Sequence, residues 1–122
     1  MAGDEVFRSS ARLRQPREFA VVMTSPQRLR GGCFELRYRR NEASGARLGL
    51  VIPKRLARRA VLRNLIKRLA REAFRHALPK LPAVDMVLRL SRPPLSSDAR
   101  VDGVLRGTWR RDIDVLLAGL QP

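Results

Sequence analysis

The segment from Ala60 to Leu78 restricts the fold of this chain more than any other stretch of its sequence. Wound as an α-helix at ~100° per residue, it gathers its apolar side chains within roughly 80° of one another, and Pro79 then ends the helix. The apolar positions are Leu62, Ile66, Leu69, Ala73 and Ala77, with Leu65 at the edge. Such a helix needs another layer of structure to cover its apolar face.

The opposite side of this helix is a stripe of polar residues, nearly all of them basic. The stripe contains Arg63, Asn64, Lys67, Arg68, Arg71 and Arg75. A solvated face is the ordinary interpretation of a charged helix. Acidic partners at i, i+4 are almost absent here, however, and like charges along one stripe destabilise a helix unless an anion neutralises them. We therefore predict a face that binds a polyanion.

A basic connector precedes this helix. Its charged residues are Lys54, Arg55, Arg58 and Arg59. They lie beside the helix N-terminus, where unpaired backbone N–H groups and the helix dipole also favour phosphate. The connector therefore extends the predicted anion-binding face.

Three stretches alternate apolar and polar residues with the period of two that is typical of half-buried strands. In the first, between residues 30 and 41, one face carries Phe34, Leu36 and Tyr38, and the other carries Glu35, Arg37 and Arg39. The inward residues of the second are Leu48, Leu50 and Ile52, and those of the third, Val84 to Leu90, are Met86, Leu88 and Leu90. Gly49 lies on the outward face of the second strand, where it permits a close approach to the backbone.

Two further helices complete the expected order. Pro16 suits the first turn of a helix that runs to about Thr24, with Gln15 before it and Glu18 near its positive end. The last helix is expected over residues 97–119, capped by Ser97, with Val101, Leu105, Trp109, Ile113 and Leu116 at helical spacing. Residues 1–13 are expected to form a loosely held arm. The order helix, strands, helix, strand, helix predicts a single α+β domain of helices packed on a small sheet.

The net charge of the chain indicates which kinds of molecule it binds. The chain has 26 Lys and Arg against 11 Asp and Glu, which gives a net charge of +15. With 44% hydrophobic residues it is too apolar for a disordered polycation. Nucleic acid is the leading partner and an anionic membrane surface the second. Without an apolar run of 18 residues or a signal-peptide pattern, we expect a cytoplasmic protein.

No catalytic or metal-binding set is visible in the sequence. Cys33 is the only cysteine and His76 the only histidine, which excludes an intrachain disulfide and makes a zinc site unexpected. The carboxylates show no paired spacing, and Asp112 and Asp114 are expected to decorate the last helix. No glycine-rich loop fits a P-loop. We expect His76 to be structural and any hydrolysis to come from a partner.

The stretch LGLVIPKRLARRAVLRNLIKRLAREAFR resembles the signature of the bacterial ribonuclease P protein component. The matching positions are Lys54–Arg55, Ala60, Arg63–Asn64, Lys67–Arg68 and Arg71–Glu72. The resemblance extends roughly from Phe7 to Pro93. Two residues depart from the family pattern, Leu65 where a third basic residue is usual and Pro53 where Ser or Ala is common.

The resemblance implies a fold that the periodicity alone does not show. It is a ferredoxin-like, ribosomal protein S5 domain 2-like fold of order α-β-β-β-α-β-α, with a mostly antiparallel four-stranded sheet and a left-handed βαβ crossover. It also implies the RNA-binding subunit of an endoribonuclease that removes the 5′ leader of precursor tRNA. In that family the catalysis belongs to the RNA subunit with Mg²⁺ held by the RNAs, and the partners are ribonuclease P RNA and precursor tRNA.

Site residues carry over by position. Contacts to ribonuclease P RNA would come from Lys54, Arg55, Arg58, Arg59, Arg63, Asn64, Lys67, Arg68 and Arg71. The cleft for the single-stranded leader would be formed by Phe19, Met23, Arg37 and Val87. Phe19 can stack on an unpaired base, although packing in the helix–sheet core is an equal alternative for Phe19 and Met23. Whether Trp109 packs in the core or over the cleft stays open.

Two other functional classes remain. A ribosome-associated or architectural RNA-binding protein would present the same basic stripe without any part in processing. A membrane-surface protein would use the amphipathic basic helix, but only Phe74 offers an aromatic residue at its polar–apolar boundary.

Overall fold

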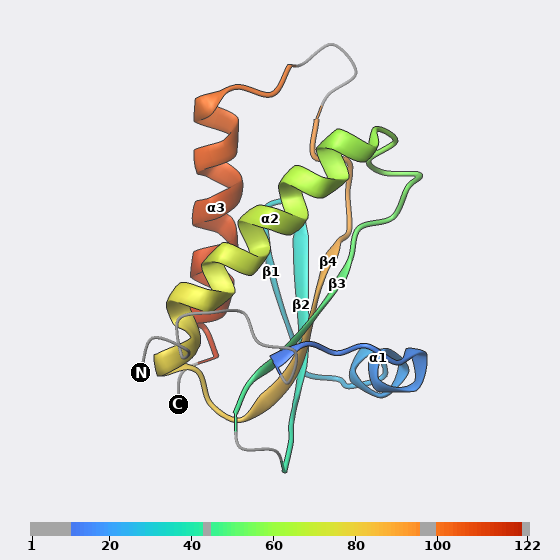
Figure 1. Cartoon of the computed structure of the whole chain (residues 1–122), viewed down its shortest axis with the longest axis vertical. Helices are drawn as coiled ribbons and strands as arrows, with labels where there is room; N and C mark the ends of the chain where they lie inside the picture. Colours follow the sequence, from blue (N-terminus) through green and yellow to red (C-terminus); the bar gives the residue numbers. More distant parts are fainter. Residues whose placement is uncertain (1–10, 43–44, 96–99, 121–122) are drawn as a thin grey trace.

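The computed structural model describes residues 11–42, 45–95 and 100–120, and it shows a four-stranded sheet with three α-helices (Figure 1). In chain order the elements are α1 (Pro16–Met23), β1 (Arg28–Gly31), β2 (Phe34–Arg40), β3 (Arg47–Val51), α2 (Ala60–Ala77), the 3-10 turn η3 (Leu78–Lys80), β4 (Val84–Leu90) and α3 (Gly103–Ala118). The predicted α+β order is confirmed.

The sheet has the strand order β1-β2-β4-β3. Strands β1 and β2, and β2 and β4, are antiparallel, whereas β3 and β4 are parallel and α2 provides the crossover between them. A parallel pair needs a long connection because the chain must return to the same end of the sheet. The mostly antiparallel four-stranded sheet is thereby confirmed, and the left hand of the crossover stays a prediction.

The two faces of the sheet carry different layers. Met86 and Leu88 of β4 belong to the main core with α2 and α3, while Val87 between them packs with α1 residues in a second, smaller cluster. This alternation follows from the period of two along a strand. Figure 1 shows α2 and α3 side by side, with α1 apart from them. In the described part of the chain, the second face therefore carries one short helix, with Leu13 beside it.

Periodicity did not predict strand β1 and indicated a single strand between residues 30 and 41. The chain instead forms a hairpin, with Gly31 paired to Phe34. Gly32 has φ +57, and a Cβ built on it would clash with Oδ2 of Asp112 in α3. Glycine is therefore required at this turn both for its backbone conformation and for the close approach of α3.

Helix α2 begins and ends within one residue of the predicted bounds. Four of its residues are buried, Ile66, Ala70, Ala73 and Phe74. Phe74 is 0% exposed, so its expected place at the polar–apolar boundary was wrong, because it points into the core. The aromatic side chain on which the membrane interpretation depended is therefore not at the surface. Among the described residues, no helix is long and apolar enough to cross a bilayer.

Helix α3 begins later than predicted. Asp102 caps it, accepting a hydrogen bond from the backbone N–H of Leu105 (2.8 Å), and the expected start near Ser97 was too early. Ser97 itself lies outside the described residues. Trp109 is 2% exposed within the main core, so it packs in the core and does not lie over a cleft.

Part of the predicted N-terminal arm is held to the sheet. The backbone N–H of Leu13 donates to the carbonyl of Leu48 (3.0 Å), and Ala11 and Leu13 are buried. The expectation of a loose arm was therefore wrong for residues 11–13. Their apolar side chains are covered, and β3 provides an unpaired edge for their backbone. The remainder of the arm, residues 1–10, lies outside the described residues.

Candidate nucleic-acid interface

Helix α1 forms a ridge on the second face of the sheet. Its Val22 is 0% exposed, and Phe19 and Met23 are partly buried beside it. A Cβ built on Gly49 would lie 2.6 Å from Cε1 of Phe19, so the ring rests directly on the backbone of β3. The predicted close approach at Gly49 is confirmed. Phe19 thus has both a packing contact and a surface that remains accessible.

Arg37 connects the end of α1 to the sheet. Its Nη1 donates to the carbonyls of Met23 (3.1 Å) and Ser25 (3.0 Å), and its Nε donates to Oε1 of Glu35 (3.1 Å). Burial alone would raise the pKa of Glu35, but the hydrogen bond and positive charge of Arg37 hold that pKa below its usual value. Arg37 therefore holds the C-terminal end of α1 against the sheet.

Val87 lies beneath α1. Its side chain is 0% exposed and packs against Val22 and Leu13. The assignment of Val87 as a direct leader contact therefore does not fit the structure as it stands, because α1 would have to move before any ligand could touch it.

The basic residues of the connector and α2 are mostly accessible. The exposed members are Lys54, Arg55, Arg58, Arg59, Asn64, Arg68 and Arg71, and Lys67 is partly exposed. Four apolar residues on the opposite side of α2 are buried, so the helix is divided by face as the sequence predicted.

Arg63 differs from the rest of the stripe. Its Nη1 donates to the backbone carbonyls of Ala57 (2.9 Å) and Arg58 (2.7 Å). Ala57 is 1% exposed, so the connector is anchored in the core at this point. Arg63 therefore fastens the connector to the first turn of α2. Nothing in the local sequence signalled this role.

The N-terminal segment adds a basic residue near the stripe. Partial burial, together with the positive charge of Arg12, lowers the pKa of Arg71. An arginine keeps its charge despite such a shift, so two guanidinium groups of like sign lie near each other. Arg12 reaches this place because it is bridged to Leu48 at the edge of β3.

Of the two departures from the family pattern, Leu65 is explained by its packing, and nothing in the structure explains the proline at position 53. Leu65 is partly buried and packs against the main core, so a basic residue there would have to leave an apolar surface. The carbonyl of Pro53 accepts the backbone N–H groups of Leu56 (3.0 Å) and Ala57 (3.1 Å) and so forms the first turn of the connector.

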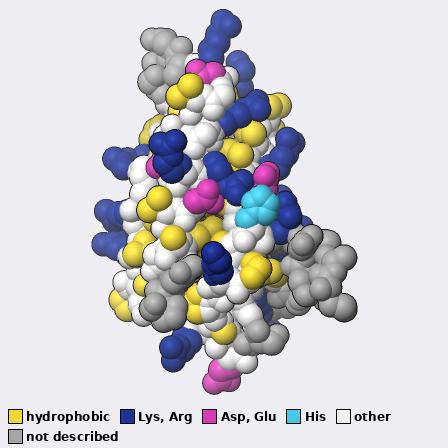
Figure 2. Space-filling model, turned by 90° about the vertical axis from the view of Figure 1, so that its left-hand side faces the viewer, with side chains coloured by type: hydrophobic (Ala, Val, Ile, Leu, Met, Phe, Trp, Pro, Cys, Tyr) yellow, Lys and Arg dark blue, Asp and Glu magenta, His cyan; other side chains and the backbone are white. Residues whose placement is uncertain are grey.

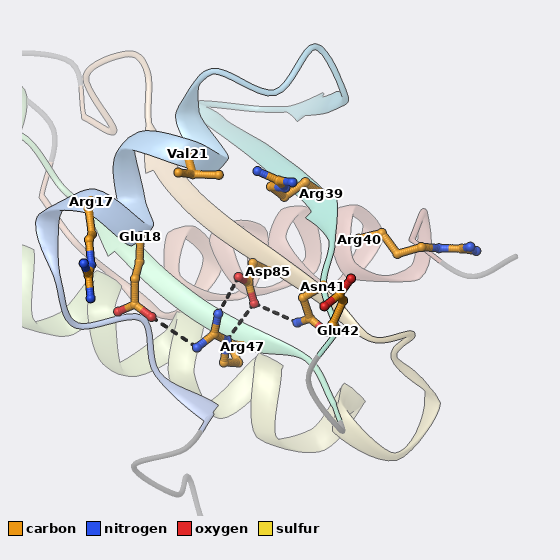
Figure 3. Close-up of a pocket in the computed structure, with 9 residues that line it drawn as sticks. All are labelled: Arg17, Glu18, Val21, Arg39, Arg40, Asn41, Glu42, Arg47 and Asp85. Carbon is orange, nitrogen blue, oxygen red and sulfur yellow. Dashed lines mark hydrogen bonds and ion pairs between the residues drawn. The ribbon is translucent and has the colours of Figure 1, made fainter.

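A network of charges attaches α1 to the sheet. Arg47 of β3 donates to both carboxylate oxygens of Asp85, through Nε (2.7 Å) and Nη2 (2.6 Å), and through Nη1 to Oε2 of Glu18 (3.1 Å). Asn41 donates to Oδ1 of the same Asp85 (2.7 Å). Figure 3 shows these contacts drawn from three separate elements and the turn after β2.

The protonation equilibria of these carboxyls reflect the network. Burial raises the pKa of Asp85, but hydrogen bonds from Arg47 and Asn41 bring it below its usual value. Backbone N–H groups of Gln15 and Arg14 lower the pKa of Glu18. The sequence signal that could have revealed the pair was an aspartate near the start of a mostly apolar strand.

The side of the molecule formed by α3 is of mixed charge. Figure 2 shows acidic side chains and the histidine lying among basic and hydrophobic ones on this face. Arg110 is paired with Glu72 (3.3 Å) and Asp114 (3.1 Å), and its Nη2 lies 2.9 Å from Nδ1 of His76. His76 therefore links α2 to α3, as its expected structural role requires.

Neither metal nor thiol chemistry is evident in the described parts of the chain. Within them, no three His, Cys, Asp or Glu side chains gather in a way that could hold a metal ion. Burial raises the pKa of the Cys33 thiol to about 11, so it stays protonated near neutral pH.

Comparison with known proteins identifies the family. The sequence model of the Ribonuclease P family matches residues 7–111. The chain belongs to this family. The ribonuclease P protein component of Azoarcus sp. is 48% identical over 90 residues, covering 74% of this chain and 75% of that protein. That of Thioalkalivibrio sulfidiphilus is 41% identical over 113 residues, covering 91% and 93%.

Solved ribonuclease P proteins share the fold. The protein from Thermotoga maritima superposes with a TM-score of 0.73 at 31% identity, covering 91% of this chain and 98% of its own. This member of the ribonuclease P family therefore presents two candidate surfaces. One is formed by the exposed basic residues of α2 and its connector, and the other is the ridge of α1.

Proposed function

We propose that this protein is the RNA-binding subunit of ribonuclease P and assists the removal of 5′ leaders from precursor tRNA. The observation that carries the proposal is the division of α2 by face, in a member of this family. Four apolar residues anchor the helix in the core, while the opposite side and the connector present a series of exposed basic groups. Such a surface suits the closely spaced phosphates of a folded RNA.

The catalytic RNA would contact the connector and α2. The proposed contacts are Lys54, Arg55, Arg58, Arg59, Asn64, Lys67, Arg68 and Arg71. Arg63 would stabilise this surface and not contact the RNA, because its Nη1 donates to two carbonyls of the connector. If five of these residues contact phosphate, log K for binding should fall with log salt with a slope on the order of −4.

The leader would lie along the flank of α1 that carries Phe19 and Met23. A partly exposed ring held against the sheet can stack on an unpaired base of any identity, while Met23 offers a softer apolar contact. Arg37 keeps α1 in place from below. Val87 is left out of the proposed contacts because α1 covers it.

In this proposal the protein provides no nucleophile. Magnesium bound by the RNA subunit and the substrate would supply the hydrolytic chemistry. The protein's basic side chains would reduce the repulsion between two polyanions, and α1 would hold the leader in register. Both effects raise the population of the correctly docked substrate.

The test is reconstitution with the family's catalytic RNA. Adding the protein should lower the magnesium and salt concentrations needed for leader removal, and no change would refute the proposal. Lys67→Ala with Arg68→Ala should weaken assembly with that RNA, compared with Arg106→Ala and Arg111→Ala on α3 as a charge-matched control. Equal affinity for unrelated RNAs, with no effect on processing, would instead indicate an architectural RNA-binding protein.

The leader contact needs a separate measurement on the assembled complex. Phe19→Leu should weaken the binding of precursor tRNA while leaving the binding of mature tRNA unchanged. Equal losses for the two substrates would show that Phe19 only packs α1 on the sheet.

A further inference from the structure

The ridge of α1 has a second flank. At ~100° per residue, Phe19 and Met23 lie on one side of the buried Val22, and Arg17 and Val21 lie on the other. The second flank opens on a hollow of about 480 Å³ between α1 and the ends of β2 and β3 (Figure 3). The body of α1 separates this hollow from the flank proposed to hold the leader.

The floor of the hollow is a closed network. The carboxylates of Glu18 and Asp85 line it, and donors already surround both. Glu18 accepts from two backbone N–H groups and Arg47, while Asp85 accepts twice from Arg47 and once from Asn41. The positive end of α1 also faces Glu18. Both acids therefore have their acceptors occupied, and although the charge of Arg39 helps to lower the pKa of Asp85, the two side chains form no direct ion pair.

The rim presents guanidinium groups with unused donors. Arg39 is exposed and makes no hydrogen bond or ion pair with another residue in the described ranges. Arg17 is exposed too, and its only such contact there is from Nε to the side-chain amide of Gln15 (2.9 Å). Val21, 44% exposed, forms an apolar wall between them. In Figure 3 the side chain of Arg40 points away from this pair.

We propose that this hollow binds a phosphodiester group of RNA through Arg17 and Arg39, with the adjoining sugar or base against Val21. The guanidinium fork matches the oxygens of a phosphate in geometry and charge, and two forks from different elements fix its position. The inference rests on the proposed function, which brings RNA to this protein. The phosphate can belong to the catalytic RNA or to a leader that crosses α1, and both present the same group.

The test compares Arg17→Ala with Arg39→Ala, as a double variant, with the charge-matched double variant Arg106→Ala and Arg111→Ala. Salt titrations measure the affinity of each protein for the catalytic RNA in one arm. In the other arm they measure the affinity of each reconstituted holoenzyme for precursor and mature tRNA. Unfolding midpoints equal to that of the wild type establish that exposed arginines were removed without loss of fold.

The double variant of Arg17 and Arg39 should lose about fivefold or more in RNA affinity in one arm of the test. The magnitude of its salt slope should fall by ~0.7, the value for one lost phosphate contact on a single strand. A loss in the first arm assigns the phosphate to the catalytic RNA, and a loss confined to precursor tRNA assigns it to the leader. A loss of affinity equal to that of the control variant, or no loss, would refute the proposed phosphate site but not the proposed function. If the wild type bound neither RNA, the proposed function would fall as well.

A substitution at Glu42 should have the opposite effect and raise the affinity for RNA. Glu42 also lines the hollow, is exposed, and has no ion pair within the described residues. Glu42→Gln removes a negative charge next to the proposed phosphate, so it should raise affinity about twofold in the same arm. Unchanged or weaker binding would count against the site.

Discussion

Replacing Arg47 with methionine tests whether the charge network attaches α1 to the sheet. The substitution keeps an unbranched stem but removes every donor that Arg47 gives to Asp85 and Glu18. Removing one partner of a buried ion pair costs ~3–5 kcal/mol, because the other charge stays buried without compensation. The Asp85 side chain is 12% exposed and keeps Asn41 as a donor. We therefore expect a loss of ~2–3 kcal/mol in the free energy of unfolding, measured with urea.

The dependence on pH distinguishes this mechanism from a simple loss of packing. The hydrogen bonds of Arg47 and Asn41, with the charge of Arg47, lower the pKa of Asp85 in the folded protein, so the stabilisation is present above the unfolded pKa of ~4. It declines as pH falls through the lower pKa of the folded state. Without Arg47, burial raises the pKa of Asp85, and protonation then relieves the unpaired charge. The stability gap between wild type and variant should therefore narrow from about pH 7 to about pH 4.

Asp85→Asn completes a double-mutant cycle. The combined variant should be more stable than the sum of the two single losses by ~1–2 kcal/mol, because the second change removes the charge that the first left unpaired. A single-variant loss under ~0.5 kcal/mol, a gap that does not change with pH, or strict additivity would refute the reasoning.

Three further predictions follow from particular contacts. Gly49→Ala should displace the Phe19 ring and lower the free energy of unfolding by ~1–3 kcal/mol, and an unchanged urea midpoint would show that the ring moves at little cost. Asp102→Ala should cost ~1 kcal/mol in the same assay through loss of the α3 cap, whereas a neutral result would place the start of the helix elsewhere. Arg63→Ala should reduce both stability and binding of the catalytic RNA, while Arg68→Ala should reduce only binding. Identical profiles for the two would argue against the clamp on the connector.

Local patterns predicted the elements whose character depends on their own residues. The bounds of α2 and β4 followed from periodicity and from the flanking Pro79 and Pro93, because an amphipathic period reports which side will be covered. Gly49 indicated a close approach, although the approaching ring came from a helix about 30 residues away in sequence. The spacing of basic residues on α2 likewise predicted its accessible face.

Boundaries and partners set by distant segments were not accessible in this way. Strand β1 is short, only partly buried, and defined by pairing with β2, so it left no strong alternation of its own. The sequence placed Phe74 at the polar–apolar boundary of its helix, and its burial depends on the elements that pack against that helix. Val87 alternated correctly to the second face of the sheet, but the position of α1 determined that it is covered there.

What the sequence determined by itself was a basic α+β chain with an amphipathic helix whose charged face is predicted to bind a polyanion, because charge and periodicity are properties of neighbouring residues. Only the tertiary structure decided which arginines remain available. Arg63 and Arg47 are indistinguishable from Arg68 and Arg39 by residue type and local context. The first two have donors committed to carbonyls or carboxylates that the fold brings beside them, while the other two keep theirs exposed. That difference arises because hydrogen-bond partners close in space can lie anywhere in the chain.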